Sequence, residues 1–102
     1  MTVKYIVKAR STVRTGDMLI TETTDYDVMK RAAVAHIMNV IMNEIGVRTN
    51  YHASLTDFSI IRSKYPHVYN IVDSYVNDLL TPLNANDEII DDEYGLTISS
   101  FE

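Results

Sequence analysis

Residues 28–46, VMKRAAVAHIMNVIMNEIG, carry the strongest structural pattern in this sequence. The apolar residues recur every three or four positions, which is the spacing of one face of an α-helix. The apolar stripe consists of Met29, Ala33, Val34, Ile37, Met38, Ile41 and Ile45, and the opposite face of Arg31, Ala35, Asn39 and Asn43. We therefore expect a helix from Val28 to Ile45, capped by Gly46 because glycine adopts a left-handed conformation easily.

The residues before this helix are typical of a helix start. Thr24 and Asp25 have short side chains whose oxygens accept hydrogen bonds from the first free N–H groups. Asp27, three positions after Thr24, completes a weakened capping box in which Asp replaces Glu. Two more helices are predicted, one starting within residues 54–57 and one running from Pro66 to about residue 81. The expected inner face of the last helix consists of Val68, Ile71, Val72, Tyr75, Val76, Leu79 and Leu80.

Alternation of apolar and polar residues predicts strands at both ends of the chain. Residues 3–10 place Val3, Tyr5, Val7 and Ala9 on one face and Lys4, Ile6, Lys8 and Arg10 on the other. A turn at 14–17 and a strand at 18–23 follow, and a three-residue loop would place Glu22 beside Lys8. Residues 47–53 alternate weakly, which is compatible with a short third strand.

The end of the chain predicts either a second hairpin, with strands at 88–91 and 96–99, or a tail with one terminal strand. We therefore expect a single domain, residues 1–102, with an α+β fold. In this fold a small antiparallel sheet, made by the N-terminal hairpin and the C-terminal strand or hairpin, packs on two to three helices.

Composition narrows the classes of function. The chain has 102 residues, a net charge of −5 and no cysteine, which excludes disulfides, zinc sites built from thiolates and thiol nucleophiles. No apolar run reaches the roughly 18 residues of a membrane helix, and no secretory signal opens the chain. We expect a complete cytoplasmic protein, and we expect direct nucleic-acid binding to be disfavoured because an acidic surface repels phosphates.

No phosphate-binding loop, hydrolase motif or metalloprotease motif occurs, so no catalytic residue, cofactor or metal is predicted. Glu22, Asp25, Asp27 and His36 are the groups that a small metal-dependent hydrolase would use, although helix capping already explains the two aspartates. Lys4, Lys8, Arg10 and Arg14 could instead meet the phosphates of a nucleotide bound between subunits of a homo-oligomer.

The N-terminal hairpin followed by the alanine-rich residues 31–35 is similar to part of a double-stranded RNA-binding domain, over about residues 3–45. That family carries a lysine cluster at the start of its helix. This chain has Asp25, Asp27 and a single Lys30-Arg31 pair there, so no family is assigned.

The leading hypothesis is a protein-binding module and not an enzyme. Its partner would be another protein with a basic surface, and the module would resemble the accessory proteins with which phages inhibit a host defence or nucleic-acid-handling protein. The cluster of acidic residues at 87–93 and the seven tyrosines motivate this hypothesis, because tyrosine is enriched at protein interfaces. The candidate partner-binding residues are Tyr65, Tyr69, Asp73, Asp87, Glu88, Asp91, Asp92, Glu93 and Tyr94.

Overall fold

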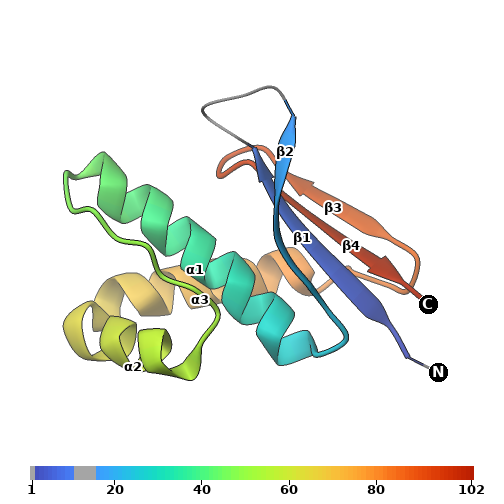
Figure 1. Ribbon diagram of the computed structural model, residues 1–102, viewed down its shortest axis with the longest axis horizontal. Helices are drawn as coiled ribbons and strands as arrows, with labels where there is room; N and C mark the ends of the chain where they lie inside the picture. Colours follow the sequence, from blue (N-terminus) through green and yellow to red (C-terminus); the bar gives the residue numbers. More distant parts are fainter. Residues whose placement is uncertain (1, 11–15) are drawn as a thin grey trace.

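The computed structural model describes residues 2–10 and 16–102. The elements in these residues are β1 (Lys4–Arg10), β2 (Asp17–Thr23), α1 (Tyr26–Glu44), α2 (Leu55–Lys64), α3 (Pro66–Leu80), β3 (Glu88–Asp91) and β4 (Leu96–Phe101). The strands form an antiparallel sheet in the order β2-β1-β4-β3, and the helices lie to one side of it (Figure 1). The α+β fold is therefore confirmed, and the chain ends in a hairpin.

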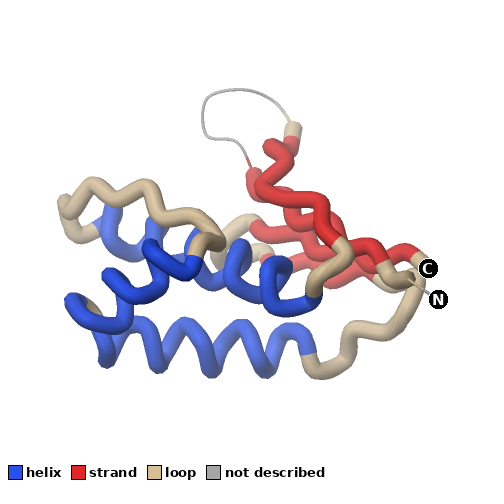
Figure 2. Tube along the Cα trace, turned by 60° about the horizontal axis from the view of Figure 1, so that its bottom comes forward, coloured by secondary structure: helices blue, strands red, loops and turns tan. Residues whose placement is uncertain are grey.

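One continuous core joins the inner face of the sheet to the helices. Alternation places Val7 and Ala9 of β1 and Leu96 and Ile98 of β4 on that inner face, and all four are at most 1% exposed. Helix α1 packs on β1 and β2, α3 packs beside α1, and α2 packs on α3, as the tube in Figure 2 shows. No helix among the described residues combines the length and apolar character that crossing a bilayer requires.

Helix α1 is covered on nearly every side. Its four consecutive residues from Ala32 to Ala35 are all buried, which a helix with one solvent-facing side does not show. The placement of Ala35 on a face opposite the core is therefore wrong. The chain after α1 runs back along the helix and covers that face.

The covering segment is held by a side chain of α1 and not by strand pairing. The Asn39 amide donates to the carbonyl of Tyr51 at 3.0 Å, and its oxygen accepts from the Tyr51 N–H at 2.8 Å. The same oxygen accepts from the Thr49 hydroxyl at 2.8 Å. The short strand considered for 47–53 is wrong, because Asn39 satisfies the backbone groups that a neighbouring strand would otherwise pair.

The ends of the helices follow local chemistry. The Asp25 side chain caps α1 by accepting from the N–H groups of Asp27 and Val28, so a capping box at Thr24 is wrong. Gly46 has a φ of +85° after α1, as expected for a C-terminal cap. Ser54 caps α2, and Pro66 occupies the first turn of α3.

Two expectations about register and orientation are wrong. Glu22 pairs with Ile6 and not with Lys8, because the hairpin pairs Arg10 with Asp17, which requires a connection longer than the expected three-residue loop. The β-bulge at Ile20 then shifts the pairing by one further residue. The carboxylate of Glu22 instead lies 3.4 Å from the Lys4 ammonium. Ile71 is 70% exposed, because the core-facing side of α3 is formed by Val72, Val76 and Leu80. Of the predicted turn at 14–17, Arg14 and Thr15 lie outside the described residues.

Replacing Asn39 with alanine should release residues 49–53 from α1. The change leaves the Tyr51 N–H and carbonyl without their partner, so we expect a loss of about 1–3 kcal/mol in the free energy of unfolding. Urea denaturation measures this loss, and hydrogen exchange should quicken first in the 49–53 segment. Asn43→Ala, one turn further along α1 and exposed, is the matched control. Equal losses in the two variants would contradict the proposed clamp, that is, the hydrogen bonds by which Asn39 holds Thr49 and Tyr51.

Candidate functional site

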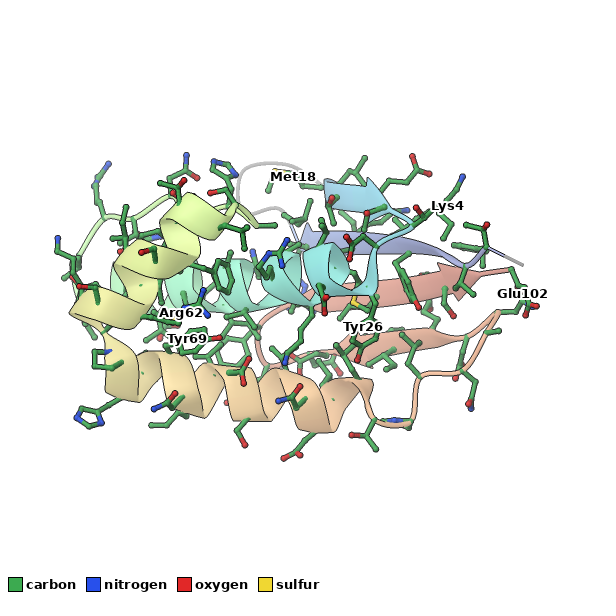
Figure 3. All side chains as sticks on the ribbon, turned by 90° about the horizontal axis from the view of Figure 1, so that it is seen from below. Lys4, Met18, Tyr26, Arg62, Tyr69 and Glu102 are labelled. Carbon is green, nitrogen blue, oxygen red and sulfur yellow. The ribbon has the colours of Figure 1, made fainter. Side chains whose placement is uncertain are left out.

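A groove of about 510 Å³ lies between β2, α1 and the segment that follows α1. One wall is the stretch of β2 from Met18 to Thr21, and the other wall is residues 50–53. The floor is formed by four residues of α1: Ala32, Ala35, His36 and Asn39. The groove exists because α1 presents alanines there, which leave room beneath the edge of the sheet. Figure 3 shows Met18 at this outer edge, where 44% of the residue is exposed.

The backbone of β2 borders this groove as a sheet edge. The Arg10 N–H donates to the carbonyl of Gly95 at 2.8 Å, so Arg10 faces β4 and the preceding Ala9 faces β2. Ala9 pairs with Met18, and alternation along an antiparallel strand then turns the N–H and C=O of Leu19 away from β1. Within the described chain, nothing hydrogen-bonds to these two groups of Leu19.

The opposite wall is fixed in place. Besides the clamp by Asn39, the Arg31 Nε donates to the carbonyl of Ala53 at 2.8 Å, and the N–H of His52 donates to Asp57 at 2.8 Å. These contacts bind four backbone groups of this wall, two of Tyr51 and one each of His52 and Ala53, to α1 and α2. On the opposite side, the outward N–H and C=O of Leu19 in β2 border the groove.

Among residues 2–10 and 16–102, no carboxylate, ammonium or guanidinium group lines the groove. His36 is the half-buried imidazole of the groove. Burial lowers its pKa from 6.5, because burial disfavours the charged form. The hydrogen bond to the Tyr94 carbonyl raises the pKa, but by less than burial lowers it. A carbonyl can only accept, so the neutral ring carries its proton on Nε2, which donates to Tyr94 at 3.2 Å. The groove is thus neutral in a protein that is acidic overall.

A second hollow, of about 680 Å³, lies beyond the C-terminal end of α1 and is lined by Asn43, Gly46, Arg48, Thr49 and Asn50. Four of these residues are exposed and all lie within one short stretch of chain. This hollow is therefore an open surface depression and holds no convergent chemistry.

The candidate acidic residues of the C-terminal hairpin divide into two groups. Asp87 and Glu88 lie at the start of β3, whereas Asp91, Asp92 and Glu93 lie at the turn at its other end, about 10 Å or more away at the rise of a strand. The Asp87 carboxylate accepts from the backbone N–H of Glu88, and the Glu88 carboxylate accepts from the Ser99 hydroxyl. The hairpin does not gather the five carboxylates into one patch.

Asp91 is buried and holds the turn to α3. It accepts a hydrogen bond from the Tyr75 hydroxyl at 2.5 Å and another from the N–H of Tyr94 at 3.2 Å, and only 8% of it is exposed. The rings of Tyr75 and Tyr94 meet edge to face at 5.4 Å. Burial first, and then the hydrogen bond to Asp91, raise the pKa of Tyr75, so its hydroxyl stays a donor at neutral pH.

Of the remaining candidates, Asp92 lies in this turn, where it is exposed and 3.7 Å from Arg10. The others lie on or beside α3, where Asp73 is 3.2 Å from Lys30. Tyr65 immediately precedes α3, and Tyr69 packs in its first turns between Phe58 and the Arg62 guanidinium (Figure 3). Ten residues of chain, about 15 Å along a helix, separate Tyr65 from Tyr75. The structure therefore brings Asp91, Glu93 and Tyr94 together and leaves Tyr65, Tyr69 and Asp73 elsewhere.

The groups considered for a metal or a phosphate are also dispersed. Glu22 pairs with Lys4, Asp25 and Asp27 form the start of α1, and His36 lies at the turn of the C-terminal hairpin. Among the described residues, no group of three or more histidine, aspartate or glutamate side chains is arranged to hold a metal ion. Lys4, Lys8 and Arg10 do share the outer face of β1, but Lys4 and Arg10 each have a carboxylate neighbour.

Sequence reasoning missed the groove. The one signal that pointed to it was the run of small residues at 32–35, which is too small to fill the space beneath a strand. Comparisons with models of protein families, with characterised proteins and with solved structures found no match. The function is therefore argued from the geometry of this chain alone.

Stability should depend on the protonation of His36 at mildly acidic pH. Because its folded pKa lies below the unfolded value of 6.5, its contribution is fully present above pH 6.5 and is lost as the pH falls through the folded pKa. Between pH 7.5 and pH 5.5, the midpoint temperature of thermal unfolding should fall less for His36→Gln than for the wild type. His67→Gln, at an exposed histidine of α3, should keep the wild-type drop. A full drop in His36→Gln would contradict this assignment.

Removing the hydroxyl of Tyr75 should loosen the C-terminal hairpin. Tyr75→Phe leaves the buried Asp91 with the Tyr94 N–H as its remaining donor, so we expect a loss of about 2 kcal/mol in the free energy of unfolding. Guanidinium denaturation measures the loss. Tyr69→Phe is the control, because the described residues provide no hydrogen bond to that hydroxyl, and it should change stability by less than about 0.5 kcal/mol.

Proposed function

We propose that this protein is a protein-binding module and that its contact surface is the groove beside β2. One observation carries the proposal: the outward backbone groups of Leu19 in the edge strand β2 border an uncharged hollow whose floor includes two alanines of α1. Concave, largely apolar sites with a few polar groups are the usual binding sites of proteins. Edge strands with unpaired N–H and C=O groups are ready templates for another chain.

The chemistry of the groove supports binding more than catalysis. Its polar groups are the amides of Asn39 and Asn50, the hydroxyls of Thr21 and Tyr51, and two imidazoles. His36 has no carboxylate beside it in the groove, and its Nε2 is bound to a backbone carbonyl. The groove therefore offers hydrogen bonds and apolar contact, which hold a ligand, and no acid–base pair to transform one.

The net charge of −5 favours a partner with a basic surface around the bound segment. Surface charges outside the contact area increase the rate at which two proteins associate, and they favour partners of opposite charge. The exposed Asp92 and Glu93, at the hairpin turn, contribute to this long-range field. An inhibitory role of the kind that phage accessory proteins perform toward a host nucleic-acid-handling protein stays a prediction.

A library of random short peptides displayed on yeast tests the proposal without knowledge of the natural partner. Wild-type protein should enrich peptides that bind it, and Met18→Glu should weaken their binding by about tenfold or more, because a carboxylate in the neutral groove loses hydration. Ile71→Glu adds the same charge at an exposed position on α3, away from the groove, and should leave binding unchanged. Equal binding to all three proteins, or no enrichment at all, would remove the proposed function.

A further inference from the structure

We propose that the occupant of the groove is a single extended, uncharged segment of a partner protein, which adds to β2 as a fifth strand of the sheet. The inference rests on the proposed function and specifies how the partner binds and what chemistry its segment has. Main-chain hydrogen bonds supply affinity in this mode, and alternate side chains supply specificity.

The two edges of the sheet differ in how well they are protected from pairing. Strand β3 has four residues and carries the carboxylates of Glu88 and Asp91 at its ends, which suits an edge that stays unpaired. Strand β2 has seven residues, and its stretch from Met18 to Thr21 contains no charged side chain. Leu19 in this stretch is 57% exposed and directs its N–H and C=O outward. The edge at β2 therefore offers the N–H and C=O of Leu19 to another strand, directly before the bulge at Ile20.

The length of the groove fits one strand, and its fixed wall favours a free segment. The stretch from Met18 to Thr21 is about 13 Å long at the rise of a β-strand, which matches a segment of about four residues. The opposite wall, residues 50–53, is fixed to α1 and lines the same groove. If a second copy of this chain paired through its own β2, the β1 strand of that copy would lie on the far side of the added strand. Residues 50–53 already occupy that position. A free segment avoids this conflict.

Charge complementarity identifies the kind of segment. No aspartate, glutamate, lysine or arginine among the described residues lines the groove, so a charged side chain on the occupant would lose its hydration without gaining an opposite charge from them. Side chains at alternate positions of the added strand would face Ala32 and Ala35, which leave space for apolar groups. The segment is therefore uncharged, with apolar residues at every second position and its basic residues outside the groove.

The test uses the tightest peptide from the display selection as the probe. Hydrogen exchange measured by NMR should show that this peptide slows exchange of the Leu19 amide, while the Met18 amide, already in the ladder with β1, changes little. Leu19→Pro removes the outward N–H but is compatible with an edge strand. It should weaken peptide binding by about tenfold or more compared with Leu19→Ala, which keeps the N–H. Thermal unfolding of both variants shows whether they are folded.

Each failure has a distinct meaning. If the peptide binds in a way that Met18→Glu weakens, yet the Leu19 amide is not protected, strand addition is wrong while the proposed function stands. If the enriched peptides are charged, the inferred chemistry of the segment is wrong. If sedimentation instead finds a dimer that Leu19→Pro dissociates, the occupant is a second copy. Should Leu19→Pro fail to fold, protection of the Leu19 amide in the wild type still decides the question.

Discussion

The burial of α1 on nearly all its sides is the constraint on which the rest of this structure depends. A helix with four consecutive buried residues, Ala32 to Ala35, needs cover from several directions at once. The sheet covers one side, α3 covers another, and the extended chain after α1 covers a third. That last cover has no regular secondary structure, so it depends on side chains of α1, Asn39 and Arg31, to satisfy its backbone.

The groove is a consequence of this arrangement. Small residues let α1 approach its covers closely, but they do not fill the space beneath the edge of β2, where the neighbouring wall is a fixed loop and not a strand. The result is an uncharged channel along a sheet edge, in a protein whose carboxylates lie mainly elsewhere. Under the proposed function, the acidic exterior and the neutral groove would have separate roles: the exterior would attract a partner, and the groove would select the segment that binds.

Local sequence patterns predicted the elements well, because periodicity and capping act over a few residues. The helix ends at Gly46, Ser54 and Pro66 follow from such signals, and so does the alternation of β1. The failures concern contacts between distant parts of the chain. Nothing near Asn39 indicates that its amide binds Tyr51. The pairing of Arg10 with Asp17 and the bulge at Ile20, which together set Glu22 opposite Ile6, also have no local signature. The candidate acidic surface relied on closeness in sequence, whereas the two ends of β3 separate its residues in space.

The middle of the sheet joins the two extremes of the polypeptide, since β1 begins at Lys4 and its partner β4 ends at Phe101. Pairings that span nearly a whole chain form slowly, because loop closure precedes any gain from the contact. During translation, α1 emerges well before β4, so its apolar surface lacks half of its sheet until β4 has also emerged. Synthesis of this protein therefore leaves a helix-rich intermediate exposed to chaperones until β4 pairs with β1.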